Sequence, residues 1–482
     1  MLFNSSVFFI FIAIFFLFWP LAKQKKNLRF AYLITASFFF YGWWDYRFLF
    51  LIIASGLLDY LLAFRIAKSS SLPKKRFFLF ASLLGNIGSL ACFKYLGFFA
   101  ENLSLLLAGV GIEASLHENI PAFMLILPIG ISFYTFQSMS YTIDVYFGRI
   151  KPTDNILHFF AYLAMFPQLV AGPILRAKDI LPQLLVNRSI SEAERWSALQ
   201  RVVFGFFKKV VIADNLAPIV AAGFASDPDS GTGLYWWFIV TAFAVQIYCD
   251  FSGYSDIAIG IAKWMGYDFK TNFNHPYISR SLREFWTRWH ISLSSWFRDY
   301  LYIPLGGSSR GSWHSYINLF VVFIISGFWH GAAWNFIVWG MLHGLFLSLE
   351  RLSGWPGRIS GWWGGGLLAT ILVIIQVWIG WVFFRSESFS QAVDILTMMF
   401  TLQGGLSFGG VGLSISWQHL QVGGLTMAII FFRELYVGYS ERSGKSWTIL
   451  ESRVFGPLFL AVLIVVSIFF RGAGDEFIYF QF

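Results

Sequence analysis

Long apolar stretches separated by short polar loops recur from one end of the chain to the other. They fall at about 7–22, 30–44, 47–64, 77–97, 121–146, 156–172, 202–223, 233–265, 317–348, 363–384, 420–433 and 454–470. A helix needs about 20 predominantly apolar residues to cross a bilayer, and only helices or closed barrels satisfy their own backbone there. The pattern predicts an all-α polytopic membrane protein with roughly eleven to thirteen transmembrane helices.

Charges in the loops predict which ends of these spans face the cytoplasm. The loops KQKKNLR (23–29) and RIAKSSSLPKKR (65–76) are strongly basic, whereas HEN (117–119) and SDPDSG (226–231) are acidic. Cytoplasmic loops carry an excess of Lys and Arg. The first stretch has no basic residue before it and four soon after it. We therefore expect a retained first span with its N-terminus outside, rather than a cleaved signal peptide.

The composition supports a membrane protein and excludes several other classes. Hydrophobic residues make up 57% of the chain and charged residues 13%, whereas soluble domains carry about 25% charged residues. The net charge of +9 comes from short basic clusters between apolar stretches, so we expect no nucleic-acid partner. Cys92 and Cys249 lie in apolar surroundings, and we expect no disulfide framework and no bound metal. No soluble stretch is long enough for a second domain, so residues 1–482 should form a single membrane domain.

One interruption of the apolar pattern lies at 166–185, FPQLVAGPILRAKDILPQLL. Gly172 and Pro173 break a helix in an apolar setting, and irregular backbone at membrane depth needs protein or a cavity around it. We expect a re-entrant or surface element here. Just beyond it, Ser191 and Glu194 form an S-x-x-E capping box, which predicts the start of a helix.

The second interruption, at 267–316, is too charged to span a membrane and too aromatic to be an ordinary loop. On a helix, Glu284 and Arg288 would pair at i, i+4, while an apolar face opposite them would carry Phe285, Trp289, Leu293 and Trp296. This predicts an amphipathic helix lying at the cytoplasmic interface of the membrane.

His330 is the first candidate for chemistry. It lies in SGFWHGAAWN, within the apolar run 318–349, where an ionisable side chain is unfavourable unless it faces a cavity or a partner. Acyl transfer needs a base that takes a hydroxyl proton near neutral pH, and histidine suits that task. Small residues at 331–333 would leave room for a thin acyl chain. The alternative is a structural histidine that bonds between helices.

His290 is the second candidate, on the predicted amphipathic helix. One histidine on an interfacial helix and one within a span could both face a cavity that opens to the cytoplasm. An ordinary histidine at a polar and aromatic interface is the alternative. His343 is a possible orienting partner, although a side chain that reaches the membrane surface is the more common role for a residue near the end of a span.

Charged residues around these histidines suggest substrate contacts. Basic side chains concentrate near His290, namely Arg280, Arg283, Arg288, Arg298 and Arg310. Arginine forks bind phosphates, so a nucleotide-bearing acyl donor is one partner and anionic lipid headgroups are the other. Asp250 and Asp256 lie in an apolar stretch and need partners. They could orient the histidines, bind Arg280 or Arg283, line a substrate path, or form structural pairs.

Five segments resemble the membrane-bound O-acyltransferase (MBOAT) family. They are FPQLVAGPILR, DFSGYSDIAIGIAKWMGYDF, NFNHPYISRSLREFWTRWHISLSSWFRDYLYIPLGG, GFWHGAAWNFIVWG and the terminal FIYFQF. They are most similar to the bacterial alginate O-acetylation branch, in the same order along the whole chain, with the core motifs at about 120–350. One departure is Ala333-Trp334 after WHGA, where relatives often have Asn and an aromatic residue. It changes the cavity lining but leaves His330 in place.

The resemblance implies a ring of helices with a thin centre and a cytoplasmic funnel. It implies that His330 and His290 are catalytic, and we assign to substrate binding Arg280, Arg283, Arg288, Asp250, Asp256, Trp329 and Asn335. The implied donor is acetyl-CoA, as a substrate, with no bound cofactor. The implied protein partner is a periplasmic or membrane-anchored polysaccharide O-acetyltransferase, and membrane lipids surround the chain. The protein would then lie in the bacterial inner membrane and move acetyl groups outward for O-acetylation of alginate or a similar exopolysaccharide.

Other functions remain to be weighed. Peptidoglycan is the alternative acceptor within the same branch. A polar-solute transporter would also need buried polar groups, but transporters often carry broken helices in repeated positions, and the two irregular regions here differ in sequence. A scaffold for periplasmic enzymes leaves the embedded histidine unexplained. No P-loop, dinucleotide glycine pattern, H-E-x-x-H or G-x-S-x-G motif occurs, so ATPase, dehydrogenase, zinc protease and serine hydrolase functions lack their basic parts.

The charge pattern predicts that the loop 65–76 faces the cytoplasm. A cysteine introduced at Ser70 should therefore react with a membrane-impermeant thiol reagent only after the inner membrane is opened. Labelling of intact cells from the periplasmic side alone would overturn this topology.

Overall fold

The computed structural model describes residues 1–170, 172–309, 311–401, 417–443, 452, 454–472 and 477–478. Every regular element in these ranges is helical, which confirms the predicted all-α fold. The described chain divides into two compact units. Unit 1 comprises Met1–Ala198 and Ala258–Lys270, and unit 2 comprises Leu199–Ile257 and Thr271–Phe482. The single membrane domain stays a prediction.

Several helical segments are long and apolar enough to cross a membrane, so the protein is a multi-pass membrane protein. Five of them are found in the described ranges: Lys26–Lys68, Leu72–Gly109, Gly233–Met265, Gly365–Arg385 and Leu420–Glu441. Two shorter apolar helices, Ser6–Ala22 and Phe455–Phe469, lie near the ends of the chain. The count of eleven to thirteen spans stays a prediction.

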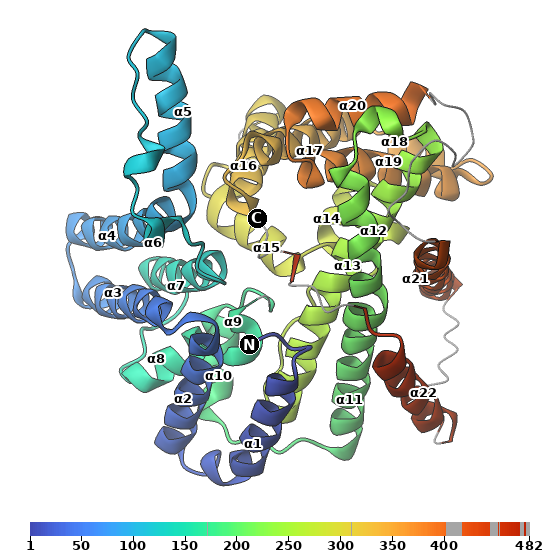
Figure 1. The fold of residues 1–482 in the computed structure, drawn as a ribbon. Helices are drawn as coiled ribbons and strands as arrows, with labels where there is room; N and C mark the ends of the chain where they lie inside the picture. The colour runs from blue at the N-terminus through green and yellow to red at the C-terminus, as the bar shows by residue number, and fades with distance from the viewer. Residues whose placement is uncertain are drawn as a thin grey trace. The chain divides into compact units, whose positions relative to one another are not determined.

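Unit 1 is built around three neighbouring helices, α3, α4 and α7 (Figure 1). Its helices are α1 (Ser6–Ala22), α2 (Lys26–Asp45), α3 (Leu49–Lys68), α4 (Leu72–Leu90), α5 (Leu96–Gly109), α6 (Ala122–Leu125), α7 (Ile131–Tyr146), α8 (Ile156–Leu163), α9 (Phe166–Leu169) and α10 (Ala177–Leu185). The apolar pattern predicted most of these helices but missed α5, which extends away from α4 and α6 in Figure 1. Helices α11 (Glu192–Phe206) and α13 (Gly233–Met265) contribute to both units.

A buried carboxylate ties α3, α4 and α7 together. Asp59 is fully buried and accepts hydrogen bonds from the hydroxyls of Ser82 and Ser138 and from Asn86 Nδ2 at 2.8 Å. Asn86 Oδ1 in turn accepts from Ser55 at 2.6 Å. Polar groups away from water are stable only when they are hydrogen-bonded, so this network fixes the register of the three helices.

The segment 166–185 is irregular, as its Gly and Pro predict. Short helices α9 and α10 flank a non-helical stretch that is buried where described. A Cβ at Gly172 would collide with the backbone of Gln168, so the chain can turn here only with glycine. The predicted capping box is confirmed as well, because Glu194 N–H donates to Ser191 Oγ at 3.2 Å and Ser191 N–H donates to Glu194 Oε2 at 2.8 Å.

Unit 2 surrounds a large aromatic and aliphatic core. Besides its part of α11 and α13, its helices are α12 (Asp214–Ala225), α14 (Leu282–Arg288), α15 (Ile291–Phe297), α16 (Ser312–His330), α17 (Trp334–Ser353), α18 (Trp355–Ser360), α19 (Gly365–Arg385), α20 (Phe389–Thr401), α21 (Trp417–Ser443) and α22 (Phe455–Phe469). Four of its tryptophans are almost completely buried, namely Trp236, Trp289, Trp339 and Trp381. Helix α20 was not predicted from the apolar pattern.

The apolar run 317–348 folds as a tight hairpin of α16 and α17. Two glycines allow the close approach, because a Cβ at Gly327 would collide with the carbonyl of Phe336, and a Cβ at Gly340 with that of Phe323. The run was predicted as one stretch with His330 in its middle. Instead, His330 is the last residue of α16, at the turn of the hairpin.

Replacing Gly340 with alanine should therefore destabilise the hairpin, because the added methyl group meets backbone that cannot move aside. The expected loss is about 1–3 kcal/mol of unfolding free energy, typical of overpacking. Thermal unfolding of the purified protein in detergent measures it. The matched control is Gly357→Ala, since no atom lies within 4 Å of a Cβ at that exposed position. Equal unfolding temperatures for both variants would contradict the close-packing argument.

Candidate active site

The predicted amphipathic helix is interrupted at His290. Helix α14 ends at Arg288, α15 begins at Ile291, and His290 between them adopts the left-handed conformation with φ of 41°. A single continuous helix was therefore wrong, although the predicted pair is confirmed, with Arg288 Nε at 3.0 Å from Glu284 Oε1. His290 is also buried within the protein, at 1% exposed, rather than exposed on the surface of an amphipathic helix.

Asn272 causes the interruption. Its main-chain oxygen accepts the N–H of Ile291 at 2.8 Å, and its side-chain Oδ1 accepts the N–H of Ser292 at 3.1 Å. In a continuous helix these two N–H groups would bond to carbonyls four residues earlier. The two hydrogen bonds to Asn272 replace the bonds of a continuous helix. The periodicity of the sequence could not reveal this replacement.

His290 lies in an aromatic surround. Its ring centroid is 4.7 Å from that of Phe251 and 6.1 Å from that of Phe273, and Asn272 Oδ1 lies 3.2 Å from Nδ1. Burial lowers the pKa of His290 to about 3, because the charged imidazolium would lose its hydration. His290 is therefore neutral at physiological pH.

His330 lies in an aromatic chamber formed by α16, α17 and α19. Its ring centroid is 4.9 Å from Trp329, 5.1 Å from Trp339 and 5.4 Å from Phe384, and the residue is 5% exposed. The Trp329 indole also lies 6.3 Å from His290. The structure thus brings the two predicted histidines, forty residues apart in sequence, to one shared indole.

His343 is buried behind this chamber rather than reaching the membrane surface, which corrects the expectation for a residue near the end of a span. It is 1% exposed, and its ring lies 4.8 Å from Trp339 and 5.0 Å from Trp286. Among the described residues, no hydrogen-bond partner meets His343 Nδ1 or the indole N–H of Trp286, Trp339 or Trp381. A buried polar group without a hydrogen-bond partner lowers the stability of the fold by about 1–3 kcal/mol. The region around His330 therefore suits a bound group that carries hydrogen-bonding atoms.

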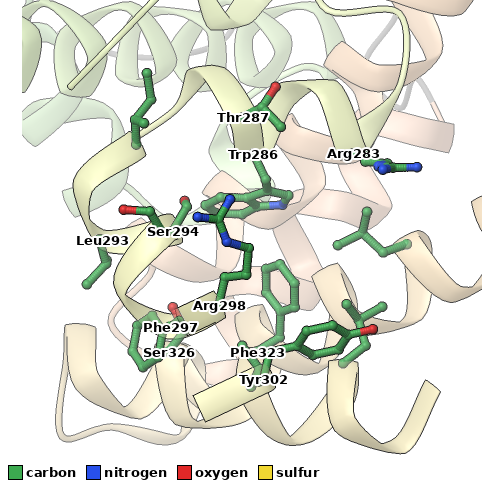
Figure 2. Close-up of a pocket in the computed structure, with 15 residues that line it drawn as sticks. Arg283, Trp286, Thr287, Leu293, Ser294, Phe297, Arg298, Tyr302, Phe323 and Ser326 are labelled. Atoms are coloured by element: carbon green, nitrogen blue, oxygen red, sulfur yellow. The ribbon is translucent and has the colours of Figure 1, made fainter. Parts of the chain in front are cut away.

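A cavity of about 330 Å³ opens beside α14, α15 and α16 (Figure 2). Its lining includes Arg283, Trp286, Ser294, Arg298, Tyr302, Phe323 and Ser326. Figure 2 shows the guanidinium of Arg298 beside the ring of Trp286, with Arg283 farther to the right and the rings of Phe323 and Tyr302 below. Ser326 is one helical turn before His330, so the two residues share a face of α16. The cavity thus carries positive charge and apolar walls, and it reaches within a helical turn of His330.

Comparison with known proteins identifies relatives of the chain. The model of the MBOAT family, membrane-bound O-acyltransferases, matches residues 149–354, which include both histidines and the cavity. The "Probable alginate O-acetylase AlgI" of Pseudomonas putida is 36% identical over 512 residues, covering 100% of both chains. The protein of the same name from Azotobacter vinelandii is 40% identical over 409 residues, covering 83% of this chain and 78% of its own. The "Peptidoglycan O-acetyltransferase" of Helicobacter pylori is 36% identical over 437 residues, covering 84% and 80%.

The chain belongs to the membrane-bound O-acyltransferase family. It is therefore an acyltransferase, and the predicted family is confirmed. The remaining predicted site residues of this acyltransferase fall into two groups. Some line the cavity, and the others form salt bridges or hydrogen bonds with other parts of the protein.

The arginines of the acyltransferase do not form one cluster. Arg283 and Arg298 line the cavity, although Arg298 Nε is also paired with Asp299 Oδ1 at 2.8 Å. Arg288 is paired with Glu284 and with Glu441 at 3.0 Å. The guanidinium of Arg280 packs against Gly366. Arg310 lies outside the described residues. Of the predicted phosphate contacts, Arg283 has the position best suited to the role.

Asp256 forms part of a partly buried charged cluster. It pairs with Arg201 Nε at 2.8 Å and with Lys208 Nζ, and Lys208 Nζ also donates to Ser252 Oγ at 3.0 Å. Its partners are therefore not Arg280 or Arg283. Two cations offset one partly buried carboxylate here, which favours the structural alternative for Asp256.

Asp250 is likewise held by other protein groups. Lys209 Nζ lies 2.9 Å from Asp250 Oδ1 and 2.8 Å from Asp214 Oδ1. The N–H of Ile478 donates to Asp250 Oδ2 at 2.9 Å, so this carboxylate binds Ile478 to α13. Asn335 is also structural in its contacts, since its Nδ2 donates to the carbonyl of Ser386 at 2.7 Å and joins α17 to the end of α19.

Two residues that shape the site were missed from the sequence. Glu350, buried on α17, accepts the N–H groups of Leu282 at 2.6 Å and Arg283 at 3.2 Å, and so caps α14 from another helix. Asn272 holds His290, as described above. Asn272 lies within the quoted motif NFNHPY, and a polar residue beside aromatic ones was the available signal. A cap supplied 68 residues away in sequence gives no local signal.

Proposed function

We propose that this acyltransferase moves acetyl groups from cytoplasmic acetyl-CoA through the bacterial inner membrane for O-acetylation of an extracytoplasmic polysaccharide, alginate or a similar exopolysaccharide. The observation that carries the proposal is the pair His290 and His330 at one shared indole, in a water-poor chamber beside a basic cavity. The names of the relatives in Pseudomonas putida and Azotobacter vinelandii support an acetylated alginate.

The cavity suits a coenzyme A thioester. Arg283 and Arg298 carry guanidinium groups that can bind phosphate oxygens, Arg298 while its Nε stays bonded to Asp299 Oδ1. The apolar walls fit the narrow chain between the nucleotide and the thioester. The chain needs no resident cofactor in this proposal, because acetyl-CoA is a substrate that is consumed. With its adenosine and phosphates at the arginines, the thioester would extend along α16 toward His330.

His330 acts as the general base in this mechanism. It takes the proton of the acceptor hydroxyl while the hydroxyl oxygen attacks the thioester carbonyl carbon. The C–O bond forms, the C–S bond breaks, and the departing thiolate of coenzyme A takes up a proton. Alternatively, His330 carries the acetyl group briefly as a relay and then passes it to the acceptor. His290, neutral and beside the same Trp329 indole, assists by hydrogen bonding.

Exclusion of water is the second contribution of the chamber. The rings of Trp329, Trp339 and Phe384 surround His330, so hydrolysis of the thioester competes poorly with transfer. The indole N–H groups of Trp339 and Trp381 lack partners among the described residues and are available to oxygen atoms of the bound acyl group. Both features favour transfer chemistry over passage of a polar solute.

Peptidoglycan is the second candidate acceptor. The relative in Helicobacter pylori carries that name and is 36% identical, as is the Pseudomonas putida relative. In either case a periplasmic or membrane-anchored O-acetyltransferase would place the acetyl group on the polymer. Analysis of ester-linked acetate on exopolysaccharide and on peptidoglycan, in cells with and without this chain, distinguishes the two acceptors.

His330→Ala should abolish polysaccharide acetylation while the protein still inserts and folds, because the chamber keeps its aromatic walls. His290→Ala should lower the transfer rate by about 10²-fold to 10⁴-fold, the usual contribution of an acid or base group. Ester-linked acetate and the amount of folded protein in the membrane are both measured. Normal acetylation by folded His330→Ala protein would reject this mechanism.

Arg283→Ala and Arg298→Ala should each raise the apparent KM for acetyl-CoA about tenfold and leave kcat nearly unchanged, because a charged hydrogen bond to phosphate is worth about 1.5 kcal/mol or more. The difference in KM between each variant and the unsubstituted protein should become smaller at high salt. The matched control is Arg358→Ala, an exposed arginine on α18 away from the cavity lining. A drop in kcat at unchanged KM would assign these arginines to chemistry instead.

A further inference from the structure

Asn272 is completely buried, and the atoms around its side chain fix how it is oriented. The N–H of Ser292 meets Oδ1 at 3.1 Å, and the hydroxyl of Ser292 meets the same atom at 2.9 Å. A backbone N–H can only donate, so the atom that it meets must be the amide oxygen. The amide Nδ2 then faces Ser255 Oγ at 3.2 Å, where the hydroxyl accepts.

This orientation determines the proton on His290. Its Nδ1 lies 3.2 Å from the same Asn272 oxygen. An oxygen can only accept, so Nδ1 must carry a proton to form this bond, and a neutral imidazole then has its lone pair on Nε2. The opposite tautomer would place two lone pairs against each other. The hydroxyl of Ser292, 3.4 Å from Nδ1, is already directed to the oxygen of Asn272.

The backbone holds this pair in register. The N–H of Ile291 donates to the carbonyl of Asn272 at 2.8 Å, and the N–H of Asn274 donates to the carbonyl of Arg288 at 2.9 Å. These two hydrogen bonds fix the backbone before and after His290. The φ of 41° at His290 is unusual for a residue other than glycine. Such backbone strain persists where the surroundings enforce it, and it is concentrated at functional sites.

We propose that Asn272 is a positioning residue of the acyltransferase, which fixes His290 as the Nδ1–H tautomer and so presents the basic Nε2 for the transfer reaction. The inference rests on the proposed function, in which His290 assists His330. It goes further by assigning the nitrogen that works and the residue that selects it. Phe251 and Phe273 flank the imidazole and oppose its rotation.

Two size-matched substitutions separate this role from a merely structural one. Asn272→Leu removes the acceptor, whereas Asn272→Asp keeps an oxygen at the same place, and the hydroxyl of Ser255 can turn to donate to it. With radiolabelled acetyl-CoA and membrane vesicles that contain the acceptor polysaccharide, Asn272→Leu should lower kcat at least about tenfold at nearly unchanged KM. Asn272→Asp should recover most of that loss. Asn119→Leu makes the same replacement of asparagine by leucine on an exposed turn, and this control should leave kcat unchanged.

A double-mutant cycle with His290→Ala completes the test. If Asn272 acts through His290, then Asn272→Leu should cost less than about twofold in the His290→Ala background. An equally large loss in both backgrounds, or full kcat in folded Asn272→Leu, overturns the inference. Should Asn272→Leu fail to fold, Ser255→Ala takes its place, with a several-fold loss of kcat in the His290 background and none without His290. Full activity of His290→Ala would instead reject the proposed role of His290 itself, and the inference with it.

Discussion

The contact of one indole, that of Trp329, with both His290 and His330 is the constraint around which unit 2 is organised. Each histidine comes from a backbone feature that is unfavourable on its own. His290 occupies a left-handed position between two short helices, and His330 ends a helix whose neighbour approaches to backbone contact at Gly327 and Gly340. Both features need support from the surrounding structure.

That support is built from buried polar groups that have partners in other elements. Glu350 caps α14, Asn272 replaces the helical bonds of Ile291 and Ser292, and Asn335 joins α17 to α19. A buried polar group without its partner is costly, so each of these bonds has only one good geometry. Aromatic packing alone would tolerate small shifts, whereas these bonds fix the positions of the two imidazoles. The site therefore combines a dry chamber with a rigid frame.

The acidic and basic residues of the predicted site lie in two different places. The carboxylates Asp250 and Asp256 are neutralised by lysines and an arginine around α13, while Arg283 and Arg298 remain at the cavity. Buried ion pairs are weak sources of net stability but costly to break. They are consistent with a structural role for Asp250 and Asp256. Sequence position alone could not separate the two groups, because all of these residues lie within charged or motif-bearing segments.

The sequence by itself determined the all-α membrane class, most helices, the capping box at Ser191 and the irregular segment at 166–185, since hydropathy, capping and chain-breaking residues act over a few positions. The catalytic role of His290 and His330 stays a prediction. The sequence did not determine that His330 lies at a hairpin turn, that His290 interrupts a helix, or that Lys208 and Lys209 rather than Arg280 and Arg283 neutralise the aspartates. Those outcomes depend on bonds between residues far apart in the chain, such as Ser292 with Asn272 and Leu282 with Glu350. Local periodicity carries no information about such partners, so only the tertiary structure decided them.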